Sequence, residues 1–138
     1  MKEPLQPIAQ FDVRPLRRVK RWRHLKWRVL VFASGVGVAK VYGRARTPPR
    51  AFVRCWLDGK KDKRGYLGYM VFPKNFGCGV MSHEATHAAV RTLSYMTSGL
   101  SWSKDVHKVN WTEERLCLLV GNLSREITVA CLSKGVWK

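Results

Sequence analysis

Acidic residues and long apolar runs are both scarce in this sequence. Nine Asp and Glu stand against 26 Lys and Arg, a formal net charge of +17 over 138 residues. The longest apolar run, Val29 to Ala39, is about half of the roughly 20 residues that a membrane-spanning helix needs. Because 46% of the residues are hydrophobic and six are Trp, a disordered basic tail is excluded. We therefore expect one soluble basic domain, residues 1–138, without a membrane span.

Cysteine pairs with metal-binding or redox spacing are also missing. The four cysteines, at positions 55, 78, 117 and 131, form no Cys-x-x-Cys motif. The N-terminus lacks the apolar segment of a signal peptide. These observations predict free thiols in a reducing compartment, and hence a cytoplasmic location.

The positive charge is concentrated in the N-terminal half of the chain. Residues 1–64 contain 18 Lys and Arg against four Asp and Glu, while residues 65–138 contain eight against five. The densest run, residues 14–28, predicts contact with nucleic acid, because cations neutralise phosphates and Trp stacks on bases. The residues proposed for this contact are Arg17, Arg18, Lys20, Arg21 and Arg23. The alternative is a solvated face that keeps the protein soluble or docks a partner.

Apolar residues recur every three positions within this run, at Leu16, Val19, Trp22 and Leu25. The spacing predicts a basic helix over residues 14–27 that packs one face on the core. Residues 1–28 are accordingly expected to form a basic N-terminal extension, and residues 29–138 the core of the domain.

The rest of the chain predicts an α+β fold. Residues 1–13, with two prolines, indicate an extended lead-in. Four segments rich in β-forming residues predict a small antiparallel sheet, with strands at 27–33, 38–43, 51–57 and 66–72. Helical spacing then predicts one helix over 77–96, a connection over 97–109 and a second long helix over 112–132.

The motif with the clearest chemistry is His83-Glu84-Ala85-Thr86-His87. Residues four apart lie on one face of a helix, so both imidazoles reach one metal ion. Glu84 lies beside that ion and is placed to take a proton from an attacking water. Zinc suits this chemistry because it accepts nitrogen and oxygen ligands and keeps an open position. We therefore expect Zn²⁺ as the cofactor.

A catalytic zinc normally has three protein ligands, and the third is open to several candidates. Glu114, in the first turn of the second long helix, reaches the histidine pair if the two helices pack antiparallel. Glu113 and His107 are the alternatives. Acidic residues in a first helical turn also occur simply because they favour the helix dipole.

The motif residues resemble the zincin metallopeptidases of the gluzincin type. Val80 to Ala89 fits the extended zincin signature, and Glu114 to Gly121 is similar to the downstream helix of ImmA/IrrE-like peptidases. The layout over about residues 66–130 also resembles small zincin-like proteins of bacteriophages. This resemblance implies His83, His87 and Glu114 as zinc ligands, Glu84 as general base, and for a phage protein the host cytoplasm.

The function expected from these features is zinc-dependent hydrolysis of peptide bonds. The free edge of the strand at 66–72 is expected to pair with an extended peptide substrate, while the basic N-terminal region docks to an anionic partner. The alternative is a non-catalytic protein in which zinc ties the two helices together. Such a protein would bind nucleic acid or a host protein.

Overall fold

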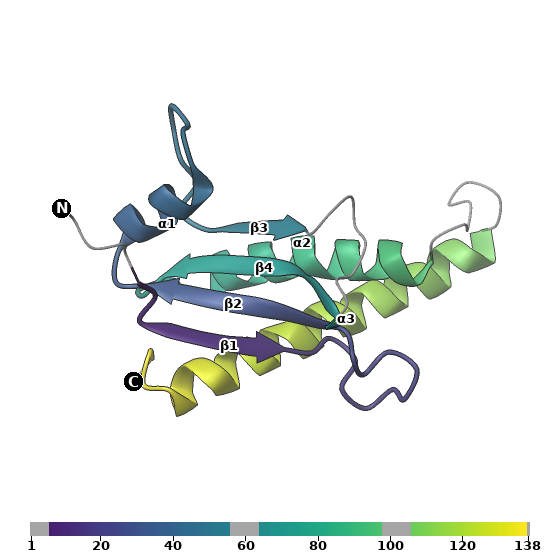
Figure 1. The fold of residues 1–138 in the computed structure, drawn as a ribbon. Helices are drawn as coiled ribbons and strands as arrows, with labels where there is room; N and C mark the ends of the chain where they lie inside the picture. Colours follow the sequence, from purple (N-terminus) through teal and green to yellow (C-terminus); the bar gives the residue numbers. More distant parts are fainter. Residues whose placement is uncertain (1–5, 56–63, 98–105, 138) are drawn as a thin grey trace.

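The computed structural model describes residues 6–55, 64–97 and 106–137, with the backbone alone for 106–112. The fold is α+β, with a four-stranded mixed sheet and three helices (Figure 1). In chain order the elements are β1 (Ala9–Val13), β2 (Lys26–Phe32), α1 (Gly35–Tyr42), β3 (Phe52–Cys55), β4 (Tyr66–Pro73), α2 (Cys78–Met96) and α3 (Val106–Ser133).

The sheet has the strand order β1-β2-β4-β3 and is mixed, whereas an antiparallel sheet was expected. Strands β1 and β3 pair antiparallel with their neighbours, but β2 and β4 run parallel. Parallel strands require a crossover connection rather than a hairpin. Residues 33–65 provide it, because they contain helix α1 and the edge strand β3.

Helix α1 replaces the strand predicted at 38–43, and that prediction was wrong. The Ser34 side chain accepts a hydrogen bond from the backbone N–H of Val36, at 3.3 Å, and so caps the helix start. Gly43, with φ of +101°, ends it. The apolar residues that suggested a strand include Val38, which is buried with Phe32, Phe52 and Val71 on one face of the sheet.

Strand β4 is central, so the expectation that its edge is free for a substrate was also wrong. It lies between β2 and β3, and every residue in it except Tyr69 is buried. Such a continuous run is typical of a strand covered on both faces. Within the described part of the chain, the outer edge of β3 is the one that has no strand partner on this side of the sheet.

The basic run between β1 and β2 is a series of turns, and the helix predicted over 14–27 is wrong. Backbone hydrogen bonds join Val19 to Leu16, Trp22 to Val19 and Leu25 to Trp22. Each bond spans three residues, which explains the spacing of three that suggested a helix. Leu16 and Leu25 are buried, but Val19 is exposed. The expected lead-in contains β1, so residues 9–13 belong to the sheet.

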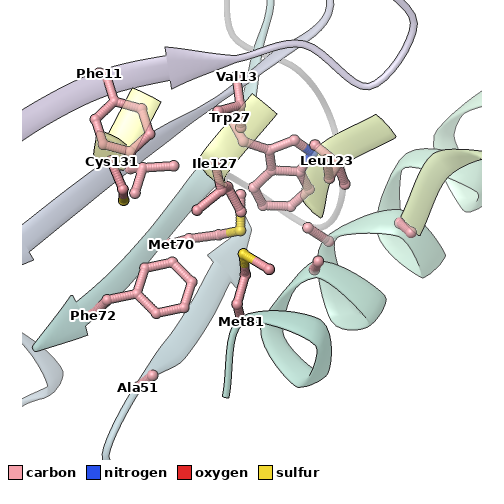
Figure 2. Close-up of a cluster of buried hydrophobic side chains, with 14 of the residues drawn as sticks. Phe11, Val13, Trp27, Ala51, Met70, Phe72, Met81, Leu123, Ile127 and Cys131 are labelled. Carbon is pink, nitrogen blue, oxygen red and sulfur yellow. The ribbon is translucent and has the colours of Figure 1, made fainter. Parts of the chain in front are cut away.

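The main core lies between the sheet and the two long helices (Figure 2). Helices α2 and α3 cover one face of the sheet, while α1 packs on the other (Figure 1). Trp27, on β2, is fully buried, and its Nε1–H donates to Thr92 Oγ1 on α2 at 3.0 Å. The Thr92 hydroxyl donates in turn to the Ala88 carbonyl. This chain of hydrogen bonds ties α2 to the start of the central strand β2.

Helix α3 begins at Val106, earlier than predicted, and its final turn ends at Ser133 close to the predicted end. Among the described residues, its segment Glu113–Ser133 is long and apolar enough to cross a membrane by length and composition. One face of this segment, including Leu119, Leu123 and Ile127, is buried in the core. Only 22% of the apolar window is buried, so packing in the core accounts for part of its composition, and the absence of a membrane span stays a prediction.

The buried Trp27–Thr92 hydrogen bond predicts a specific pattern of stability. Thr92→Val keeps the shape of the side chain but leaves the indole N–H without its acceptor, and we expect the free energy of unfolding to fall by about 1–3 kcal/mol. Thr92→Ser, which retains the hydroxyl, is the control and should lose less. Urea unfolding followed by circular dichroism measures both. A valine variant as stable as the serine variant would contradict the role of the hydrogen bond.

Glu126 predicts a pH-dependent contribution to stability. Burial opposes its ionisation, but hydrogen bonds from the Arg17 guanidinium and the Arg14 backbone N–H prevail and lower its pKa below the usual 4.5. The folded state therefore favours the carboxylate, and the stabilisation is present above about pH 4.5 and is lost as the pH falls below it.

We expect Glu126→Gln to lower the free energy of unfolding at pH 7 by about 1–2 kcal/mol, a value reduced for the exposure of Arg17. The difference from the wild type should shrink between pH 4.5 and pH 3 in urea titrations. Glu113→Gln, at an exposed position on the same helix, is the matched control. An equal loss in both variants would show that the effect is one of net charge.

Candidate metal site

The two histidines of the motif lie one turn apart on α2, as predicted. Their Nε2 atoms are 3.2 Å apart, and their rings meet edge to face with centroids separated by 4.8 Å. The His83 side chain is 69% exposed. The opposite face of α2 carries small buried residues, Ala85, Ala88 and Ala89, which pack in the core. The imidazoles therefore project from the helix away from the core.

The separation of the two imidazole nitrogens fits a shared metal ion. Two nitrogen ligands at 2.0–2.1 Å from a tetrahedral zinc lie about 3.3 Å apart. The observed 3.2 Å is close to this value. The alternative for this distance is a hydrogen bond in which one neutral imidazole donates to the other. Two imidazole nitrogens on one face of a helix are in either case a suitable ligand pair for Zn²⁺.

Glu84 lies beside the histidine pair but, unlike them, is buried. It is 6% exposed, and its Oε1 is 4.0 Å from His83 Nε2. Burial raises the pKa of this carboxyl above its usual value, and the two histidines, where protonated, oppose that rise. A carboxyl with a raised pKa is a better proton acceptor than an exposed one. The structure thus brings together His83, Glu84 and His87.

These three residues line a cleft of about 880 Å³ between α2 and the edge strand β3. One wall is formed by the exposed face of α2 and the other by the backbone and side chains of residues 51–55. Two arginines line the same cleft, Arg54 on β3 and Arg91 on α2. The sequence reasoning missed both of them and also missed β3 as the edge. The position of Arg91 four residues after His87 was the available signal.

The structure does not bring Glu114 or Glu113 to the histidine pair. Across the described residues there is no group of three or more His, Cys, Asp and Glu side chains that could hold a metal ion. Both glutamates are exposed near the start of α3. His107, the third candidate, lies outside the residues whose side chains are described.

The register between α2 and α3 explains why the predicted third ligand is distant. The helices are antiparallel, and Thr128 Oγ1 donates to the Met81 sulfur at 3.5 Å, which places these residues opposite each other. Glu114 is 14 residues before Thr128, whereas His87 is six residues after Met81. At 1.5 Å per residue, Glu114 lies about 12 Å beyond His87 along the helices. The prediction required Glu114 to lie over the histidines, but this register places it beside the C-terminal end of α2.

The basic residues proposed for nucleic-acid contact lie at the other edge of the sheet, in the segment that joins β1 to β2 (Figure 1). Arg17 forms a salt bridge with Glu126 at 2.7 Å, and Arg21 lies over the Trp22 ring at 4.8 Å. All five residues are exposed, including Arg18, Lys20 and Arg23, for which no ion pair is described. Contact between these residues and nucleic acid stays a prediction.

Comparisons with known proteins found no relative of this chain. No protein-family model matches it, and neither the curated proteins nor the solved structures include a significant match. The resemblance to zincin peptidases therefore rests on the motif residues, and function has to be argued from the geometry of the cleft.

The convergence of the two imidazoles predicts a zinc site that depends on both. Protein purified without chelator should contain about one zinc per chain. His83→Ala and His87→Ala should each weaken zinc binding at least about tenfold, because each removes a direct ligand. Competition with a fluorescent chelator measures the affinity.

Three matched variants test the same site further. His24→Ala removes an exposed imidazole from the β1–β2 segment and should retain zinc. Glu114→Ala and Glu113→Ala should also retain it, given the distance of both residues from His87. Zinc loss in either glutamate variant would contradict the observed register, and retention in both histidine variants would contradict the site itself.

Proposed function

We propose that the protein is a zinc-dependent hydrolase of peptide bonds. The observation that carries this proposal is the convergence of His83 and His87, at 3.2 Å, in a cleft that also contains the buried Glu84. Metal ligands alone would fit a structural site, but structural zinc sites are usually closed by four protein ligands. The exposed pair leaves the remaining positions of a bound zinc open for water and substrate, and the described residues bring no third protein ligand to it.

An extended peptide is the substrate shape that suits the cleft. The outer edge of β3 presents backbone N–H and C=O groups along one wall, and such an edge pairs readily with an added strand. The opposite wall carries the histidines on α2. A peptide paired with β3 therefore runs past the two imidazoles, with its backbone held by hydrogen bonds that do not depend on its sequence. The edge available for this pairing is that of β3, rather than that of the strand at 66–72.

Glu84 provides the proton transfers of the reaction. A bound Zn²⁺ would supply Lewis acidity for the scissile carbonyl and lower the pKa of a water to about 7. Glu84 orients the attacking water and accepts one proton as the new C–O bond forms. It then gives that proton to the departing nitrogen as the C–N bond breaks. Its burial between the helix and the sheet holds the carboxyl in place for both transfers.

The alternative is a non-catalytic protein stabilised by zinc. In that case the ion would connect the two long helices, and ligands from both helices would be expected. Both histidines instead lie on α2 and project away from the core. The placement of the ligand pair favours the hydrolase, and it also means that His83→Ala should lose zinc without unfolding.

Replacing Glu84 separates catalysis from metal binding. Glu84→Gln keeps the size of the side chain but removes the proton acceptor, so we expect hydrolysis to fall by about 10²–10⁴-fold. Zinc content should be unchanged, because Glu84 is not a proposed ligand. Mass spectrometry of a random peptide pool, incubated with zinc-loaded protein, measures cleavage. Wild-type and Glu84→Gln proteins that cleave at the same rate would exclude this role.

A further inference from the structure

The cleft contains an unbalanced positive charge next to the proposed zinc site. Of the residues that line it, Arg54 and Arg91 are cationic and Glu84 is acidic, and the carboxyl of Glu84 is buried. Arg50 lines an adjoining hollow that also includes His83. A cleft lined by charges of one sign concentrates the electrostatic field and attracts ligands of the opposite charge.

Arg91 is the cation best placed to contact a ligand. It is exposed and lies four residues after His87, so it projects from the same face of α2. Among the residues that the structure describes, no carboxylate forms an ion pair with it. Arg54, by contrast, is already held by other groups. Its guanidinium donates to the Tyr69 hydroxyl and the Tyr42 carbonyl, and lies over the ring of Phe52.

The spacing along α2 matches the spacing along an extended peptide. His87 and Arg91 are about 6 Å apart along the helix axis, at 1.5 Å per residue. In a β-strand, side chains two positions apart point to the same side and are about 6.6 Å apart. If one side chain of a peptide on β3 lies over His87, the side chain two positions away therefore lies over Arg91.

The direction in which the peptide pairs with β3 decides whether the peptide residue over Arg91 lies before or after the cleaved bond. Figure 1 shows α2 and β3 running in the same direction. Arg91 lines the cleft together with Cys55, the last residue of β3. A peptide antiparallel to β3, the slightly more stable arrangement, runs from Arg91 towards His83. The peptide residue that lies over Arg91 is therefore N-terminal to the peptide residues that lie over the histidines.

We infer that Arg91 forms a subsite for an acidic side chain, located about three residues N-terminal to the cleaved bond of a peptide substrate. This inference rests on the proposed function for the position of the cleaved bond. The charge in the cleft would make the protein select Asp or Glu at that position and reject Lys or Arg. Arg91 would then be a residue that determines specificity, without taking part in the chemistry.

Binding tests the subsite without turnover. Zinc-loaded Glu84→Gln protein is titrated with three fluorescein-labelled octapeptides of Ala and Ser, which differ by a single central Glu, Gln or Lys. At low salt, we expect the Glu peptide to bind about fivefold more tightly than the Gln peptide, and the Lys peptide most weakly. Arg91→Glu in the same background should reverse the order of the Glu and Lys peptides. Arg125→Glu, an equal charge change at an exposed position on α3, should preserve it.

Cleavage of a random decapeptide pool by the wild-type protein separates this inference from the proposed function. Acidic residues should be enriched at the third residue before the cleaved bond. In the Arg91→Glu variant, basic residues should be enriched there instead. Cleavage without this enrichment, or a binding order unaffected by Arg91→Glu, overturns the subsite and leaves the peptidase in place. A binding order that Arg91→Glu reverses, with no cleavage of any peptide, supports the subsite and overturns the peptidase. Failure of all three octapeptides to bind overturns the subsite.

Discussion

The position of helix α2 depends on the buried contact between Trp27 and Thr92. The indole is fully buried at the start of the central strand β2, and its hydrogen bond to Thr92 holds the C-terminal half of α2 against the sheet. Gly68, on the neighbouring strand β4, is required here, because a Cβ atom would collide with the Trp27 ring and the Arg54 carbonyl. The absence of a side chain at Gly68 thus leaves room for the indole and lets β3 lie close to β4. Since β3 and α2 are the two walls of the cleft, its width is set by this part of the core.

The two faces of α2 have opposite roles that follow from side-chain size and polarity. Alanines at 85, 88 and 89 let the helix approach the sheet closely, while His83, His87 and Arg91 form a polar row on the cleft side. Glu84 is at the boundary between the faces and is the one carboxyl among the buried residues of the described chain. Burying a carboxyl disfavours its charged form. Its burial therefore lowers stability where the carboxyl is ionised, and its position beside the two imidazoles is the one that the proposed proton transfer requires.

The sequence was most informative where local pattern decides structure. The His-Glu-x-x-His spacing and the helical period placed α2 and its histidines correctly, because residues four apart share a helix face wherever the helix packs. Long-range pairing was less accessible. The residues of α1 have strand-forming side chains, but the Ser34 cap and the crossover between β2 and β4 favour a helix there. Glu114, the predicted third ligand, lies away from the histidines for the same reason. The register of α3 against α2 depends on the length of their connection and on contacts such as that of Met81 with Thr128.

The structure also separates the basic residues of this chain into two surfaces with different properties. The segment between β1 and β2 lies at one edge of the sheet, and part of its charge is used internally, because Arg17 anchors the segment to Glu126 on α3. The arginines of the cleft lie at the opposite edge, beside the histidines. An anionic partner bound to the first surface would leave the second accessible. The large net charge therefore does not identify a single partner. In the β1–β2 segment, one arginine anchors the segment to α3 and the others form an exposed cationic surface. In the cleft, the positive charge acts on whatever occupies the proposed active site.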